Sequence, residues 1–302
     1  MNSWIKKIVI FITLIFSICS ICLADINKEA VYLKGIEYAS VGKFSEAKGE
    51  FASILNSNSY NTYNASSRLC LQLIAKVGKS LKRDSLIHIF NGINLGIQRN
   101  WEDAISEFDK IINSDPNCQE AYLYRGAAYL SVGSTDRALA DFEQVIKLNS
   151  DNADVFYFRG LLFYSLGNSL PDVKSNDNYL NKAVIDFDRC IKIDPEYAEA
   201  YYCSGRIALD RGAYEIAIVD FDKALVCAPG FADACYYKAG ACERAFERGM
   251  DLKYKNSAIE AYKEFLHYAS SQDLRRVEEA KQRINALIWI TGTKGPGWWK
   301  NK

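Results

Sequence analysis

The sequence contains very little histidine and has no excess of either charge, and both absences remove classes of function. His88 and His267 are the only histidines and lie far apart in the chain, so the residues for a metal cluster or for a Cys/His or Ser/His nucleophile are lacking. Lysine plus arginine and aspartate plus glutamate both number 37, which gives a formal net charge of zero. Because nucleic-acid binding needs a basic surface, we expect no nucleic-acid partner. We also expect no metal, no cofactor and no catalytic residue.

A phosphate-binding loop is absent as well. Gly78-Lys79-Ser80 resembles the end of such a loop, but the motif also needs a glycine where this sequence has Leu73, and no strand is expected before it. Carboxylates occur on every expected helix and are most simply solvated faces. The sequence therefore predicts a protein that is not an enzyme.

Closely spaced cysteine pairs are also missing. Two of the nine cysteines lie in the N-terminal segment, and the rest are odd in number. We interpret most of them as buried apolar side chains with free thiols rather than as a disulfide framework. They are Cys70, Cys118, Cys190, Cys203, Cys227, Cys235 and Cys242.

The first residues have the features of a targeting segment. Lys6 and Lys7 precede an apolar run over residues 8–18, and small residues end the segment at Ala24. This pattern predicts a signal peptide at residues 1–24 and an exported protein, located in the periplasm or cell envelope. The alternative is an uncleaved N-terminal helix that associates the protein with the membrane, although residues 8–24 are at the lower limit for spanning a bilayer. A lipoprotein is disfavoured because isoleucine, rather than a small residue, precedes both Cys19 and Cys22.

The chain between residues 119 and 231 contains one pattern three times. In each copy a glycine lies in an aromatic-rich segment, and an alanine followed by a phenylalanine lies in the next segment. The return distance from Phe187 to Phe221 is 34 residues, and apolar residues recur at helical spacing, which indicates an array of helical hairpins. The copies are Gly126 with Ala138 and Phe142, Gly160 with Ala183 and Phe187, and Gly205 with Ala217 and Phe221.

These residues resemble the tetratricopeptide repeat, which has a glycine and tyrosine on its first helix and an alanine and phenylalanine on its second. The resemblance implies an all-α solenoid of helical hairpins that forms a right-handed superhelix. It also implies that the first helices line a concave groove that takes peptides, extended segments or partner helices. Glycine and alanine suit the crossing of two helices because a side chain is nearly absent there.

Weaker copies divide the rest of the chain. We expect a first repeat at residues 28–61, an extra helix at 62–84, a five-repeat array at 85–272, a capping helix at 273–290 and an aromatic tail at 291–302. The extra helix should break the regular stacking, unless it pairs with residues 86–97 as a degenerate repeat. Pro171 and the polar residues around it predict a surface loop inside the fourth repeat. Six hairpins, the extra helix and the cap make about 14 helices.

One polar pair recurs beside the packing positions. Arg125 and Arg159 directly precede two of the glycines, and Asp141 and Asp186 directly precede two of the phenylalanines. We expect these residues to join the two helices of a hairpin by charge-assisted hydrogen bonds, with Glu107 as a further acceptor within reach. Ser204 interrupts the pattern before Gly205.

Helical spacing places an inner stripe on each first helix, opposite the side that faces the second helix. A tyrosine-rich stripe with a polar border suits protein recognition, and the alternative is that some of these tyrosines pack on neighbouring repeats. The stripe residues that we expect to bind a partner are Glu120, Leu123, Leu130, Asp154, Tyr157, Leu161, Tyr164, Glu199, Tyr202, Arg206, Leu209, Asp233, Tyr236, Glu243 and Arg244.

The stripes begin with acidic residues, which disfavour an acidic C-terminal tail as ligand and favour a basic or apolar segment. We therefore expect a scaffold that binds other proteins as an extended peptide or a helix. The alternative is a receptor for a small ligand or a glycan in the cell envelope. Trp298 and Trp299 are a further candidate contact, since they either fold back on the cap, dock on a partner or lie at a membrane interface.

Overall fold

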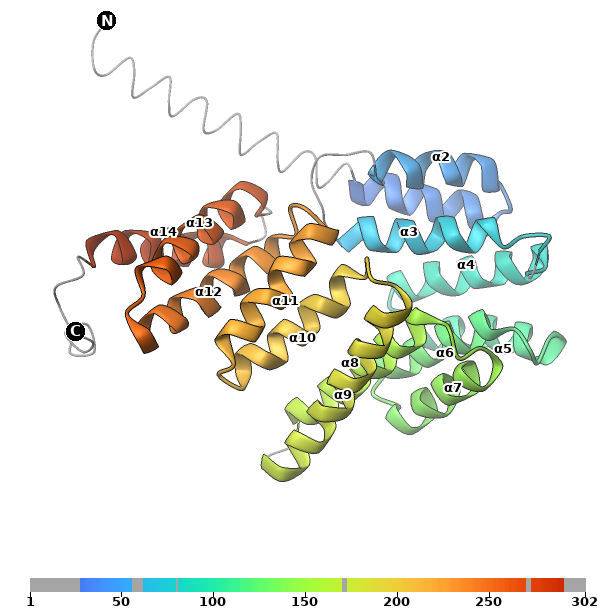
Figure 1. Cartoon of the computed structure of the whole chain (residues 1–302). Coiled ribbons are helices and arrows are strands. Elements are labelled where there is room, and N and C mark those ends of the chain that lie inside the picture. The colour runs from blue at the N-terminus through green and yellow to red at the C-terminus, as the bar shows by residue number, and fades with distance from the viewer. Residues whose placement is uncertain (1–27, 56–61, 80, 170–172, 270–272, 291–302) are drawn as a thin grey trace, which may run out of the picture.

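The computed structural model describes residues 28–55, 62–79, 81–169, 173–269 and 273–290, and it is all-α (Figure 1). Within these ranges the only β-type pairing is an isolated bridge between Val77 and Leu81. A helix over residues 28–40 precedes thirteen others, so the described part of the protein has the predicted number of helices. In sequence order these are α2 (Phe44–Leu55), α3 (Thr62–Ala75), α4 (Arg83–Ile97), α5 (Trp101–Ser114), α6 (Gln119–Ser131), α7 (Thr135–Leu148), α8 (Ala153–Ser169), α9 (Val173–Ile193), α10 (Ala198–Asp210), α11 (Tyr214–Cys227), α12 (Ala232–Gly249), α13 (Leu252–Tyr268) and α14 (Leu274–Trp289).

Neighbouring helices form antiparallel hairpins that pack one on the next. The pairs α4/α5, α6/α7, α8/α9, α10/α11 and α12/α13 are each joined by a short connection and make the most extensive helix contacts among the described residues. They follow one another in a curved row from α4 to α13, and α14 packs on α13 at its end (Figure 1). This arrangement is a helical-repeat solenoid, in which each unit buries its apolar face against its neighbours.

Each hairpin is held at one close crossing. In the fourth unit, a methyl group added at Gly160 would lie 2.6 Å from Cε1 of Phe187, and the Phe187 ring is fully buried. The same relation holds in the second unit, where a methyl group at Gly92 would lie 2.5 Å from Cε1 of Phe108. The recurrence of glycine on the first helix and phenylalanine on the second therefore has a steric cause, because the ring occupies the space that a side chain would need.

The predicted arginine pairs are confirmed. Arg125 donates from Nε and Nη2 to both carboxylate oxygens of Asp141, at 2.9 and 2.7 Å. Arg159 binds Asp186 in the same two-pronged way at 2.8 and 2.7 Å. Each pair joins the first and second helix of one hairpin, which is the structural role expected from the sequence. Where Ser204 replaces the arginine, its hydroxyl donates to Asp220 at 3.0 Å.

The regular alternation of the array is interrupted at α3, and this point is called the reversal because the helices on either side of α3 run in the same direction. At the start of α4 the guanidinium of Arg83 lies 4.9 Å from the ring centroid of Phe44, which starts α2, and further along Phe90 stacks on Phe51. The helices α2 and α4 therefore run parallel, whereas the short connections elsewhere make consecutive helices antiparallel. The single unpaired helix between two hairpins produces this change, because it makes the first helix of the next hairpin run parallel to the last helix before it.

Two predicted element boundaries were wrong. The extra helix ends at Ala75 instead of reaching Asp84, because Gly78 adopts a φ of +75°, which no α-helix contains. The insertion in the fourth unit lengthens α8 and α9 instead of forming a long surface loop. This extension is held by an apolar contact, since Leu180 is buried against Gly167.

Candidate functional site

The first turns of α6, α8 and α10 carry the acidic row Glu120, Asp154 and Glu199, and the protein itself covers this row with α3. Beyond the end of α3, Nζ of Lys76 lies 2.9 Å from Oε1 of the buried Glu120. Within the helix, Arg68 lines a small cavity of about 40 Å³ together with Asp154 and Glu199. The acidic row therefore faces the two basic side chains of one helical segment.

Apolar contacts reinforce this placement of α3. Cys70, Leu73 and Ile74 are buried and belong to the same apolar cluster as Phe108 of α5 and Ala121 of α6. One side of α3 thus packs on the inner side of the array while its basic residues reach the acidic row. Neither contact could be read from the sequence, because the position of an unpaired helix depends on the tertiary packing around it.

The surroundings of Asp154 disfavour its charged form. Burial raises the pKa of the Asp154 carboxyl, and the nearby carboxylates of Asp194 and Glu199 raise it further. The Tyr197 hydroxyl, which donates to Asp154 at 3.2 Å, and the charge of Lys76 act in the opposite direction. A cation brought to this row is therefore favoured.

Reversing one charge should loosen α3. In Lys76→Glu, the buried Glu120 faces a like charge, so we expect the docking of α3 to weaken by about 1–2 kcal/mol, a value reduced by the exposure of Lys76. Hydrogen exchange of the α3 amides measures this change. The control is Lys76→Glu combined with Glu120→Lys, which restores an ion pair of opposite orientation and should return exchange toward that of the parent protein. Equal exchange in the single and double variants would show that this pair does not hold α3.

The inner-stripe tyrosines are half-buried and take part in packing. Tyr157, Tyr202 and Tyr236 each contact the buried phenylalanine of their own hairpin, with ring centroids 6.2, 6.1 and 5.0 Å apart. Tyr157 also contacts Tyr197, and Tyr202 contacts Phe231, both at 5.0 Å. One side of each ring therefore packs against neighbouring side chains. The three tyrosines are half-buried, so the rest of each ring remains partly accessible. Tyr197 and Phe231 were missed from the sequence, although each directly precedes the first helix of its unit.

The remaining stripe residues differ in accessibility. Leu123 and Leu209 are buried within the array, so they contribute to its core. Leu130, Leu161 and Tyr164 are half-buried on the inner side of α6 and α8.

The stripe of α12 is covered by the capping helix α14. Arg276 of α14 binds Asp233 at 2.6 Å, and Arg283 binds the buried Glu243 at 3.1 Å. Tyr236 lies beneath the guanidinium of Arg276, 5.5 Å from its ring centroid. In this stripe Arg244 remains exposed.

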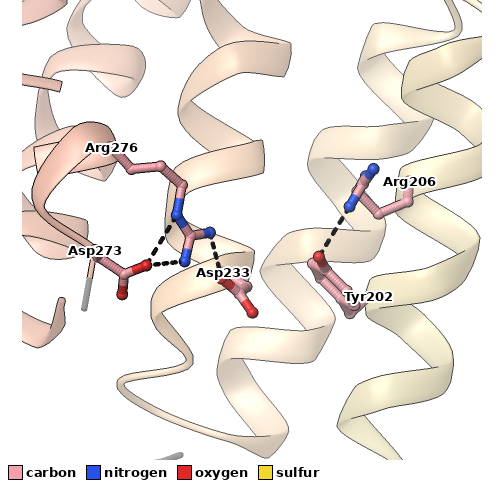
Figure 2. Close-up of polar contacts among 5 residues, drawn as sticks. All are labelled: Tyr202, Arg206, Asp233, Asp273 and Arg276. Carbon is pink, nitrogen blue, oxygen red and sulfur yellow. Dashed lines mark hydrogen bonds and ion pairs between the residues drawn. The ribbon is translucent and has the colours of Figure 1, made fainter. Parts of the chain in front are cut away.

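Arg206 occupies the centre of the inner side, on α10. Its Nη1 donates to the hydroxyl of Tyr202 at 3.0 Å, and its guanidinium lies 3.7 Å from the ring centroid of Tyr237 on α12. Figure 2 shows Arg206 beside Tyr202, and Arg276 with Asp233 and Asp273 on the neighbouring helices. The site therefore combines a positive group with aromatic surface from two repeats.

An apolar cavity of about 410 Å³ lies where α3 meets α4, α5 and α6. Leu69 and Cys70 of α3 form one side, and Ile93 of α4 and Ala127 of α6 lie on the inner side of the array. The cavity arises at the reversal of the array, where the regular hairpin-on-hairpin packing is interrupted. It was not predicted, since it depends on the placement of α3.

The described residues hold no cluster of three or more potential metal ligands. The ring Nδ1 of His88 lies 2.7 Å from Oε2 of Glu107, which also binds Lys110, so this histidine is part of a local hydrogen-bond network. All seven cysteines in the described ranges are free thiols and all but Cys227 are buried, as expected from the sequence. Burial raises the pKa of the Cys70 thiol to about 12, which keeps it protonated and unreactive.

Several sequence-based expectations fall outside the described residues. These are the signal peptide at residues 1–24 and the tail with Trp298 and Trp299. Within the described residues, no helix is both long and apolar enough to cross a membrane.

Comparison with known proteins agrees with this geometry. The family described as TPR repeat matches residues 126–167. The TPR protein TTC0263 from Thermus thermophilus superposes with a TM-score of 0.53 at 16% identity, over 67% of this chain and 99% of that chain. PilW, a type IV pilus biogenesis factor, superposes with a TM-score of 0.53 at 18% identity, over 68% of this chain and 91% of that chain. No curated protein matches the sequence.

An array of antiparallel hairpins, closed by glycine–phenylalanine crossings in the units before α12, defines an all-α repeat solenoid. This is the fold of tetratricopeptide-repeat proteins, and residues 126–167 match the TPR repeat family.

Proposed function

We propose that the protein is a non-enzymatic exported scaffold that binds other proteins on the inner face of its array, defined by the inner-stripe residues of α6, α8, α10 and α12. The observation that carries this proposal is the docking of α3. This helix is apolar on one side, and Arg68 and Lys76 bring positive charge to the acidic row. A surface that binds one helix with an apolar side and basic side chains is suited to bind other segments with the same properties, as in helix-in-groove recognition.

The part of the inner face left for a partner lies beside α3. It includes the half-buried Leu130, Leu161 and Tyr164, the central Arg206 and the exposed Arg244. Aromatic and aliphatic surface with a few polar groups is the composition of protein-binding sites, because it offers contact area at low entropic cost. The partner is a protein that presents an extended segment or a helix.

The location is proposed from the N-terminal sequence. Lys6, Lys7 and the apolar residues after them support export to the periplasm or cell envelope. If the segment is not cleaved, it anchors the protein to the membrane instead. Trp298 and Trp299 are proposed as an additional contact, on the cap, on a partner or at a membrane interface.

The cavity at the reversal supports a second candidate function, a receptor for a small apolar molecule. Its volume of about 410 Å³ is in the range of ligand pockets. Its lining is mostly apolar, with Trp101 and Phe108 among its aromatic residues. It suits an apolar molecule better than a glycan, which needs convergent hydrogen-bonding groups.

Site-directed photo-crosslinking tests the scaffold function. A photoreactive amino acid is placed at Leu130 or Arg244 on the inner face, and at the strongly exposed Ile185 of α9 or Val226 of α11 as matched controls. In envelope preparations of the source cells, we expect discrete protein adducts from the inner positions and none from the controls. Identical patterns from all four positions, or no adduct from the inner ones, would contradict the proposal.

A further inference from the structure

The apolar cavity at the reversal is larger than helix packing alone explains. Its volume is about 410 Å³, whereas protein interiors contain few voids larger than one water molecule. Residues from six of the described helices line it, and they range from Tyr32, in the helix over residues 28–40, to Phe158 of α8. A large apolar space that several repeats enclose together is the usual form of a small-molecule site.

The wall of the cavity is uncharged. Among the described residues that line it, none is acidic or basic. Its polar groups are hydroxyls and one thiol: Oη of Tyr32 lies 3.9 Å from Sγ of Cys70, and Ser131 donates to the carbonyl of Ala127 at 3.0 Å. Burial raises the pKa of the Tyr124 hydroxyl well above its usual value, so this group stays neutral. A charged ligand would lose its hydration here without gaining an ion pair, so the cavity selects uncharged molecules.

Five aromatic side chains line the cavity and favour an aromatic ligand. Two of them pack on glycines of α4. A methyl group added at Gly96 would lie 3.0 Å from the ring of Trp101, and one added at Gly92 would lie 2.5 Å from that of Phe108. Phe108 also stacks with Tyr124 of α6, with ring centroids 6.2 Å apart. Rings that are fixed in this way can pack on the rings of a ligand with little loss of entropy, whereas a flexible alkyl chain would lose the freedom of each of its bonds.

The volume of the cavity and its entrance limit the size of the ligand. An apolar cavity of about 150 Å³ holds one benzene ring, so about 410 Å³ suits two or three joined rings. Ile97 and Ser131, the last residues of α4 and α6, line the cavity and are exposed to solvent. A ligand can therefore enter between the C-terminal ends of these two helices.

We propose that the cavity binds an uncharged molecule of two or three aromatic rings and that this ligand holds α3 on the array. Leu69 and Cys70 of α3 form one side of the cavity, and residues of α4, α5 and α6 form the rest of its wall together with Tyr32 and Phe158. A ligand that contacts both parts binds the arrangement in which α3 is docked and shifts the equilibrium toward it.

The ligand thereby acts on the inner face. Lys76, just beyond the end of α3, binds Glu120 of the acidic row, so a ligand that fixes α3 also keeps this part of the row covered. This inference rests on the proposed receptor function. It specifies the ligand and links the cavity to the surface proposed for partner proteins.

Binding of N-phenyl-1-naphthylamine to the full-length protein tests the ligand class. This probe is uncharged, contains two aromatic units and fluoresces more strongly in apolar surroundings. Its matched comparator is 8-anilino-1-naphthalenesulfonate, which has the same ring skeleton and one negative charge, and decan-1-ol serves as an uncharged alkyl competitor. We expect a single saturable site that binds the uncharged aromatic probe at least about 10-fold more tightly than either comparator.

Variants that fill the cavity test its location. Ala127→Phe places a ring in the cavity from within α6, and Ser131→Phe does so at the exposed end of the same helix, where folding is least affected. The control is Ala140→Phe at an exposed position of α7 outside the cavity. Each filling variant should weaken binding of the probe at least about 10-fold, whereas the control should bind it like the parent protein. Circular dichroism checks the folding of all three.

The outcomes separate this inference from the receptor function. Tighter binding of decan-1-ol than of the aromatic probe, confined to the cavity by the filling variants, keeps the receptor function but overturns the aromatic ligand. Equal affinity for the two naphthalene probes, or binding that survives both filling variants, also overturns the inference. If none of the three compounds binds, the receptor function fails with it.

Hydrogen exchange tests the link between the ligand and α3. If undocking of α3 opens the site, the uncharged probe at ten times its Kd should slow exchange of the α3 amides about 10-fold. The capping helix α14 contributes no residue to the cavity and serves as the control. Unchanged exchange of α3 at saturating probe, or equal slowing in α14, overturns the control of α3 by the ligand.

Discussion

Replacing Asp141 by asparagine is expected to lower the free energy of unfolding by about 3 kcal/mol, since it leaves the guanidinium of Arg125 partly buried beside a neutral amide. Asp141 is only 5% exposed and binds Arg125 through both carboxylate oxygens. The hydrogen bonds that Arg125 donates to Asp141 raise the pKa of Arg125, and an arginine side chain stays charged even without them, so the cation is retained after the substitution. Urea denaturation gives the total change, and hydrogen exchange should place the loss of protection in α6 and α7.

The matched control for this substitution lies on the same arginine. Asp109 also binds Arg125, at 2.6 Å, but its side chain is 44% exposed. Water replaces much of what Asp109→Asn removes, so this variant should lose less than about 1 kcal/mol. If the two asparagine variants lose the same stability, burial does not determine the strength of these pairs.

Much of the fold could be predicted because its determinants are local and repeated. The spacing of Gly126 and Phe142 reflects one steric contact inside a hairpin, and the same contact recurs in every clear unit. The position of Arg125 beside that glycine also fixes its partner, since two helices that cross at the glycine bring Asp141 next to it. Patterns of this kind need no knowledge of distant parts of the sequence.

The placement of α3 was not predictable for the opposite reason. Its partners lie far away in the sequence, as the contact of Lys76 with Glu120 shows. Its helical periodicity continues through Val77, but the backbone leaves the helix where Gly78 takes a positive φ. A periodic pattern therefore predicted the helix but neither its end nor the surface on which it lies.

The candidate site was predictable only in part. Helical spacing identified the inner stripe, but not which of its members the fold covers, so Glu120 and Glu243 are buried beneath α3 and α14. Arg206 was among the predicted residues, but the sequence does not reveal which side chains surround its guanidinium. Neighbouring first helices bring tyrosines to it, and among the described residues no carboxylate forms an ion pair with it.

The repeat geometry can be tested by adding one methyl group at a helix crossing, which should have a large effect on stability. Gly160→Ala should lower the free energy of unfolding by about 1–3 kcal/mol, because the new methyl would lie 2.6 Å from the buried ring of Phe187 and one of the two helices must shift. Denaturant unfolding measures the total loss, and hydrogen exchange of α8 and α9 should show where it occurs.

Gly240 provides the control, since it also lies inside a first helix but has no neighbour within 4 Å of the added methyl. Gly240→Ala should therefore raise the free energy of unfolding by about 0.5–1 kcal/mol through helix propensity alone. The two substitutions are chemically identical, so opposite signs can come only from their surroundings. Combining Gly160→Ala with Phe187→Leu shortens the opposing side chain and should cost less than the sum of the two single changes. Strict additivity would mean that the methyl group and the ring do not meet, and that the glycine serves the repeat in some other way.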